Sequence, residues 1–278
     1  MTAARPRIGA LTLTIVAGLG CLAIALPALY TISISFRLPE DIMRQPPVLL
    51  PPHVTLIDYV EMWQAFPVAR YLKNSVVLTM GTIIVAISVA ALAGYGFARF
   101  RFRFQDQLMV VILVAQMFPG VATYIPLFQA LQTLGLYNTH PGLIILFVGY
   151  VTPFSTWLLY GYFKTIPREL EEAAWIDGCS PIAALLRVVL PLALPGIAAA
   201  AVLGMLTAWN EFVFAILFLR DQNLWPITVA IANFSGEYYT AWGSMAAAAI
   251  IASIPPIVGF ALIQRRLIGG LLAGAVRG

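Results

Sequence analysis

The sequence predicts an all-α membrane protein with six transmembrane helices. Of the 278 residues, 61% are hydrophobic and only 10% are charged, and the mean hydropathy is +0.89. Soluble domains carry about 25% charged residues, so this chain has too little polar surface for a water-facing globule. Six apolar segments are long enough to cross a bilayer as helices. Basic residues are more frequent in every second connection between these segments, as expected for a membrane protein whose cytoplasmic connections are enriched in Lys and Arg.

The expected spans are interrupted by proline at several places. Pro27 should kink the first span, and Pro119 and Pro126 should break the third, with local unwinding at residues 117–120. Unwound backbone at membrane depth must face protein or a water-filled cavity. The six spans are residues 8–36, 74–98, 108–131, 141–163, 193–219 and 241–263.

A short amphipathic helix is expected between the first two spans, at residues 55–66. Its apolar residues recur at helical spacing, which is typical of a helix lying on the membrane surface, with Tyr59 and Trp63 at headgroup level. Thr55 with Asp58 resembles a capping box. We divide the chain into residues 1–54, holding the first span and a Pro-rich loop, and a core domain of residues 55–278.

The basic residues predict the orientation. Eleven of the 16 lie in the N-terminal segment, the second connection, the fourth connection and the C-terminal tail. Since basic residues concentrate on the cytoplasmic side, both termini and the fourth connection should face the cytoplasm. The expected location is therefore the cell membrane, crossed several times.

The stretch of residues 166–195 at the fourth connection mixes four acids with an amphipathic pattern. It should form two short helices: one over residues 168–177 that Gly178 terminates, and a second that Ser180 caps with Pro181 in its first turn. Such a hairpin, with an apolar face and an acidic rim, suits docking into a groove on another protein. The same pattern also fits an ordinary loop with two surface helices, and the residues alone leave both interpretations open.

Three arginines alternate with three phenylalanines directly after the second span, at residues 99–104. One interpretation is a contact with acidic lipid or with another subunit. The simpler one, which we favour, is a positive-inside anchor with aromatic residues at the interface.

Glu211 is the only acid expected within a span, which makes it a functional candidate. Trp209, Asn210 and Glu211 place an aromatic face, an amide and a carboxylate side by side, a combination that suits a path for sugars. Alternatively, Asn210 and Glu211 bond to neighbouring helices and bridge the spans.

Catalysis by this chain is not expected. Neither lysine, Lys73 nor Lys164, follows a glycine, so the chain has no phosphate loop. Cys21 and Cys179 have no neighbours at metal-ligand spacing, so no metal site is predicted. The basic residues lie in short connections, so nucleic acid is not an expected partner.

The fourth connection resembles the EAA loop of ABC-importer permeases. Glu172-Ala173-Ala174 is followed after three residues by Gly178, after nine by Val188, and after one more by Leu190-Pro191. The family has isoleucine where Val188 stands. The resemblance implies a permease fold of the ABC importer type I class, with this loop as a coupling helix seated on an ATP-hydrolysing subunit. The residues assigned to coupling are Glu171, Glu172, Ala173, Ala174, Asp177, Gly178, Leu190 and Pro191.

Residues 208–211 resemble the fifth span of carbohydrate-importer permeases. Similar stretches at residues 93–99, 117–119, 126–128, 134–139 and 236–238 extend the resemblance over roughly residues 55–278. We identify a sugar ABC-importer permease of the maltose or trehalose type. The last residues resemble the end of maltose-type permeases, where the tail in some members enters the ATPase dimer interface. They are Gly274, Ala275, Val276, Arg277 and Gly278.

The resemblance implies a set of partners. They are a second permease, a dimer of ATP-binding subunits that holds ATP and magnesium, an extracytoplasmic sugar-binding protein, membrane lipid and the sugar itself. No cofactor is expected in this chain. The alternatives are a secondary transporter with Glu211 as its ion site, an intramembrane enzyme, and an amino-acid or metal importer.

Overall fold

The computed structural model describes residues 6–45, 49–117, 120–236 and 240–275. The chain divides into two compact units. Unit 1 holds residues 1–68 and 231–252, and unit 2 holds residues 69–230 and 253–278. The division expected at residue 54 stays a prediction.

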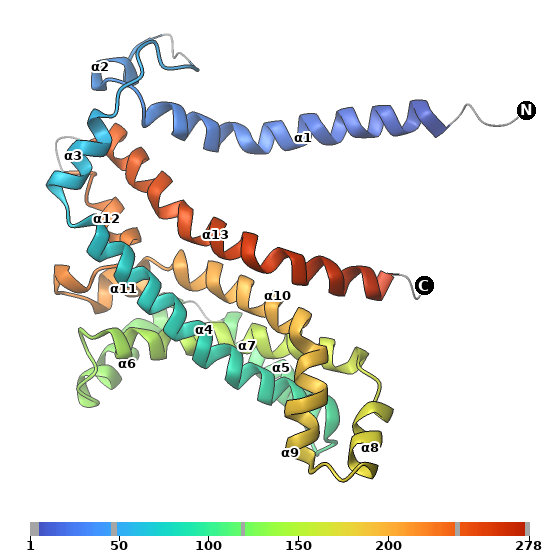
Figure 1. The fold of residues 1–278 in the computed structure, drawn as a ribbon. Coiled ribbons are helices and arrows are strands. Elements are labelled where there is room, and N and C mark those ends of the chain that lie inside the picture. Colours follow the sequence, from blue (N-terminus) through green and yellow to red (C-terminus); the bar gives the residue numbers. More distant parts are fainter. Residues whose placement is uncertain (1–5, 46–48, 118–119, 237–239, 276–278) are drawn as a thin grey trace, which may run out of the picture. The chain divides into compact units, whose positions relative to one another are not determined.

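The described residues are dominated by α-helices (Figure 1). The α-helices are α1 Pro6–Ile34, α2 Pro39–Ile42, α3 Ile57–Ala65, α4 Val68–Arg99, α5 Gln105–Val114, α6 Gly120–Thr133, α7 His140–Thr165, α8 Glu169–Ile176, α9 Pro181–Ala184, α10 Leu190–Trp209, α11 Val213–Phe218, α12 Ile227–Ala232 and α13 Trp242–Ala275. Three shorter turns complete them: a 3₁₀ turn η1 at Ala115–Met117, a π turn η2 at Leu185–Val189 and a 3₁₀ turn η3 at Gln222–Leu224.

Five helices of the described chain are long and apolar enough to cross a membrane. A sixth span results if the pair Gln105–Met117 and Ala122–Thr133 is counted as one, although its halves are bent by 99°. The all-α multi-span class is therefore confirmed, and the third span is broken as expected. Phe118 and Pro119, at the expected break, lie outside the described residues.

The fifth span differs from the prediction. A separate second hairpin helix and a span over residues 193–219 were expected, but one helical segment of 29 residues runs from Pro181 to Trp209. The π turn η2 joins its two parts, and the Leu190 N–H donates to the carbonyl of Leu185, five residues back. Pro191 has no N–H to continue an α-helical ladder, and a π turn accommodates such a missing bond without ending the helix.

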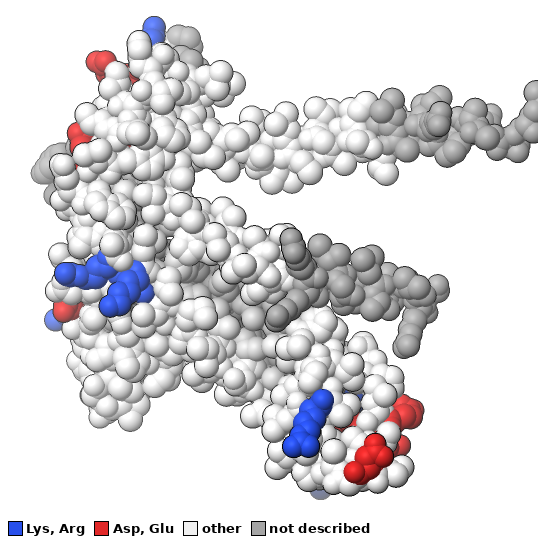
Figure 2. Space-filling model, in the orientation of Figure 1, with Lys and Arg blue, Asp and Glu red and all other residues white. Residues whose placement is uncertain are grey.

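In unit 2, α7 packs against α10, and two apolar clusters form the core. One cluster contains Phe147, Phe214 and Phe218, and the other contains Leu159 and Phe163. Many large apolar side chains on α4, α7 and α10 remain exposed, which is expected where the solvent is lipid. On the face shown in Figure 2, the charged side chains of unit 2 gather at two ends, with an uncharged stretch between them.

In unit 1, α3 is held against the start of α13 by a buried carboxylate. Asp58 is 4% exposed, and Ser244 Oγ donates to Asp58 Oδ1 over 3.0 Å. The expected capping box is therefore wrong: Thr55 Oγ1 does accept from the Ile57 N–H, but Asp58 faces α13. Burial raises the pKa of the Asp58 carboxyl, and the bond from Ser244 opposes this rise. A methyl group on Gly243 would occupy the space of that carboxylate.

We expect Gly243→Ala to destabilise the protein because the added carbon collides with a buried side chain. Overpacking of this kind typically costs about 1–3 kcal/mol, or roughly 5 °C in unfolding temperature. Thermal unfolding of the purified protein in detergent measures the effect. Gly20→Ala is the matched control, since nothing lies near its added carbon. Equal unfolding temperatures for the two variants would contradict the described contact.

Candidate functional site

The hairpin of α8 and α9 follows its local sequence closely. The first helix was expected at residues 168–177 and is observed at Glu169–Ile176. Gly178 follows it at φ +86°, a left-handed conformation that favours glycine at a helix end. The Ser180 hydroxyl accepts a bond from the Ala183 N–H at 3.2 Å, and Pro181 occupies the first turn of α9. The local signals for both helix ends are confirmed.

The hairpin exposes a group of apolar and acidic side chains. Ile176 is 87% exposed and Ile182 is 71% exposed, although both belong to the apolar face of the sequence pattern. Among the residues assigned to coupling, Glu172, Ala173, Asp177, Gly178 and Pro191 are exposed, Leu190 is half-buried, and Ala174 and Glu171 are buried. The exposed members leave a surface that a partner can contact, whereas Glu171 faces inward.

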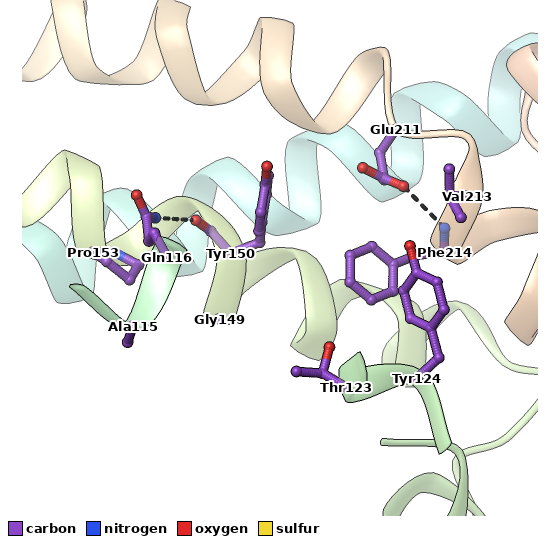
Figure 3. A pocket seen from close by; sticks show the side chains of 10 residues that line it. All are labelled: Ala115, Gln116, Thr123, Tyr124, Gly149, Tyr150, Pro153, Glu211, Val213 and Phe214. Carbon is purple, nitrogen blue, oxygen red and sulfur yellow. Dashed lines mark hydrogen bonds between the residues drawn. The ribbon is translucent and has the colours of Figure 1, made fainter. Parts of the chain in front are cut away.

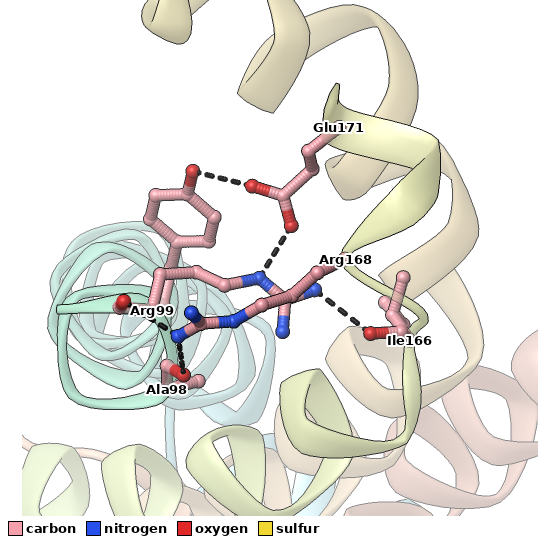
Figure 4. A network of polar contacts seen from close by, with 6 residues as sticks. Ala98, Arg99, Ile166, Arg168 and Glu171 are labelled. Atoms are coloured by element: carbon pink, nitrogen blue, oxygen red, sulfur yellow. Dashed lines mark hydrogen bonds and ion pairs between the residues drawn. The ribbon is translucent and has the colours of Figure 1, made fainter. Parts of the chain in front are cut away.

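Glu171 is held by a polar network at the end of α4 (Figure 4). Its Oε1 forms an ion pair with Nε of Arg99, the last residue of α4, and both side chains are buried. Its Oε2 accepts from the hydroxyl of Tyr95 at 2.9 Å. The Arg99 Nη2 also donates to the carbonyl of Ile166 at 2.9 Å. The network therefore ties α8 and the chain leading into it to α4.

Arg168 strengthens the same junction from the other direction. Its Nη2 donates to the carbonyl of Arg99 at 2.7 Å and reaches that of Ala98 at 3.4 Å (Figure 4). These carbonyls belong to the last turn of α4, which has no further helical partners for them. The sequence did not reveal this network, since its residues are separated by about 70 positions and share no local pattern.

A pocket of about 420 Å³ lies among α6, α7 and the break after α10 (Figure 3). Glu211 projects into it, and its Oε1 accepts from the Phe214 N–H at 2.9 Å, so it caps α11. Glu211 was expected inside a span, but α10 ends at Trp209, and Glu211 lies two residues beyond. The pocket is lined by Ala115, Gln116, Thr123, Tyr124, Gly149, Tyr150, Pro153, Glu211, Val213 and Phe214.

The structure does not bring the predicted triplet together at this pocket. Trp209 is buried, and the Asn210 amide donates back to the carbonyl of Leu206 at 2.8 Å. The tyrosines that line the pocket with Glu211 are instead Tyr124 and Tyr150, together with the ring of Phe214. Sequence reasoning missed both, because position on a long apolar helix does not show which aromatic residue faces a pocket.

The candidate tail lies at the edge of the described chain. Gly274 and Ala275 end α13, and Val276, Arg277 and Gly278 lie outside the described residues. The stretch 236–238, which is part of the family resemblance, is described only at Gly236. Glu237 and Tyr238 lie outside the described residues. Within the described residues, no group of three or more His, Cys, Asp or Glu could hold a metal ion.

We expect Glu171→Ala to destabilise the protein strongly, because it leaves Arg99 buried without a counter-charge. Removing one partner of a buried ion pair costs about 3–5 kcal/mol, or roughly 10 °C in unfolding temperature. Glu169→Ala is the matched control, since Glu169 is exposed on the same helix. Thermal unfolding in detergent compares the two variants. A similar small decrease of the unfolding temperature in both would argue against the network.

Comparison with known proteins places the chain among transporters. Residues 83–271 match the family described as "binding-protein-dependent transport system inner membrane component". The trehalose/maltose transport system permease protein MalG of Thermococcus litoralis is 34% identical over 257 residues, covering 91% of both chains. The trehalose transport system permease protein SugB of Mycobacterium tuberculosis is 34% identical over 255 residues, covering 91% of this chain and 92% of its own.

Solved structures show the same fold. A chain from the crystal structure of a bacterial ABC transporter involved in the import of the acidic polysaccharide alginate superposes with a TM-score of 0.78, at 22% identity, over 95% of this chain and 98% of its own. A chain of the MetNI methionine ABC transporter in inward-facing conformations gives 0.58, at 14% identity, over 78% of this chain and 99% of its own. With its permease fold and a family match over most of its length, the chain belongs to the inner membrane components of binding-protein-dependent transport systems.

Proposed function

We propose that this chain is the permease subunit of an ATP-driven, binding-protein-dependent sugar importer. The observation that carries the proposal is the hairpin, which exposes apolar and acidic side chains while a buried ion pair fixes it to α4. A surface held rigidly in this way suits the transmission of force from another protein. The relatives at 34% identity are named for trehalose and maltose, which supports sugar as the cargo.

The proposed partners follow from this role. A dimer of ATP-binding subunits, holding ATP and magnesium, contacts the hairpin on the cytoplasmic side, where both termini also lie. The tail, residues 274–278, contacts the same dimer. A second permease completes the translocation path, and an extracytoplasmic binding protein delivers the sugar. Binding of ATP draws the two ATP-binding subunits together. The hairpin moves with the subunit that it contacts, and this movement shifts the population between inward- and outward-facing states.

The pocket at Glu211 is our candidate for a part of the sugar path in this chain. Tyr124 and Tyr150 offer aromatic faces and hydroxyl groups, while Gln116 and Glu211 offer an amide and a carboxylate. Its volume of about 420 Å³ is in the range of small-molecule sites. Trp209 is buried behind this pocket and supports the break that carries Glu211, whereas the Asn210 side chain bonds within its own helix.

We expect Ile176→Asp to abolish sugar uptake without changing the stability of the protein. Ile176 is almost fully exposed, so a charge there disturbs few contacts within the chain but disrupts an apolar docking surface. ATP-driven uptake into proteoliposomes containing the whole assembly measures transport, and co-purification measures the bound ATPase. Ile176→Leu keeps the apolar surface and is the control. Full uptake by Ile176→Asp would exclude this face from coupling.

We expect Tyr150→Phe and Glu211→Gln to lower the maximum rate of uptake by about fivefold each. Losing one hydrogen bond to the moving sugar costs about 1 kcal/mol, which corresponds to that factor. The sugar concentration for half-maximal uptake should stay the same, because the binding protein captures the sugar first. Asn210→Ala should behave as wild type, since that side chain bonds within its own helix.

Uptake driven by an ion gradient without ATP would establish a secondary transporter instead.

A further inference from the structure

A second cavity, of about 760 Å³, lies beside the hairpin and next to the network around Arg99. It is bounded by the end of α4, by Phe100 and Arg101 of the turn that follows, by the start of α5, by the end of α7 and by the chain that leads into α8. Four basic side chains line it, together with two acids and one tyrosine. They are Arg99, Arg101, Lys164 and Arg168, with Asp106, Glu169 and Tyr160.

Three of the four basic side chains at this cavity form no salt bridge within the described chain. Among the described residues that line it, the only ion pair is that of Arg99 with Glu171. The Lys164 amine donates to the hydroxyl of Tyr160 at 2.8 Å and lies 4.6 Å from its ring centroid, so its contacts are uncharged. Arg168 donates to backbone carbonyls, which are also uncharged. Asp106 and Glu169 line the cavity and Glu171 pairs with Arg99, so three carboxylates face four cations, and the net charge of +1 suits an anion with a single charge.

The place of the cavity indicates which anion. Arg99 ends one candidate span and Lys164 lies in the last turn of another. Their side chains therefore lie where hydrocarbon gives way to lipid headgroups. Three phenylalanines of the adjoining turn are exposed beside these charges, which a purely aqueous anion site would not require. They are Phe100, Phe102 and Phe104.

We propose that this cavity binds the headgroup of an anionic phospholipid. The lipid phosphate lies among Arg101, Lys164 and Arg168, and its acyl chains run along the exposed apolar surface beside them. Basic pockets between transmembrane helices on the cytoplasmic side are suited to such headgroups. Because Arg168 also bonds to the last turn of α4, the bound lipid lies against the junction that positions the hairpin.

The test uses the full-length chain, purified with the subunits that accompany it, and native mass spectrometry during lipid titration. The probes are dioleoyl phosphatidylglycerol, dioleoyl phosphatidylcholine and inorganic phosphate. Wild type should bind the anionic lipid in preference to the zwitterionic one. The double variant Arg101→Gln/Lys164→Gln should bind it about thirtyfold more weakly, since each basic group near an anionic headgroup contributes about fivefold.

Arg103→Gln/Arg187→Gln is the matched control, because it removes the same charge from two exposed residues that do not line the cavity. It should bind phosphatidylglycerol as wild type does. If the double variant cannot be purified, Lys164→Gln alone should weaken binding about fivefold, and Lys164→Arg should restore it.

Three results would overturn the proposal. An equal loss of phosphatidylglycerol affinity in the two double variants would show only a general charge effect. Equal binding of both lipids by wild type would show no preference for an anionic headgroup. Displacement of the lipid by millimolar inorganic phosphate would assign the cavity to a soluble anion.

Discussion

The position of the hairpin depends on one buried ion pair, between Arg99 at the end of α4 and Glu171 in α8. A short α-helix has little stability of its own and takes its place from tertiary contacts. Here the contact is ionic, largely removed from water, and supported by Tyr95 and by the carbonyl of Ile166. Taking either charge away leaves the other buried without compensation. α8 is consequently a fixed extension of α4, and its exposed side chains keep a defined orientation.

The pocket at Glu211 lies where the helices around it are interrupted. α10 ends at Trp209. The segments Gln105–Met117 and Ala122–Thr133, on either side of the break before α6, are bent by 99° relative to each other. Broken helices leave backbone groups without partners, and these are tolerated at membrane depth only beside protein or a water-filled space. The Glu211 carboxylate satisfies one of them, at the start of α11. The same break thus creates both the space and the polar group that faces it.

The sequence predicted those features that depend on neighbouring residues. Gly178 and Ser180-Pro181 determine their helix ends through local backbone geometry, and the expected ends agree with the structure to within one residue. Features that join distant positions were missed or misassigned. Asp58 was paired with Thr55 nearby, whereas its partner, Ser244, lies 186 residues away. Arg99 and Glu171 carry no periodic signal that links them, and Tyr124 and Tyr150 look like many other aromatic residues of an apolar helix.

The π turn in the fifth span has a mechanical consequence. The helical segment from Pro181 to Trp209 is continuous, so it connects the hairpin at one end to the Asn210–Phe212 break at the other, with a bend between α9 and α10 (Figure 1). No loop interrupts this segment, so a displacement of the hairpin is passed along the helix to the break. The first non-helical connection that follows the hairpin along the chain is therefore the one carrying Glu211.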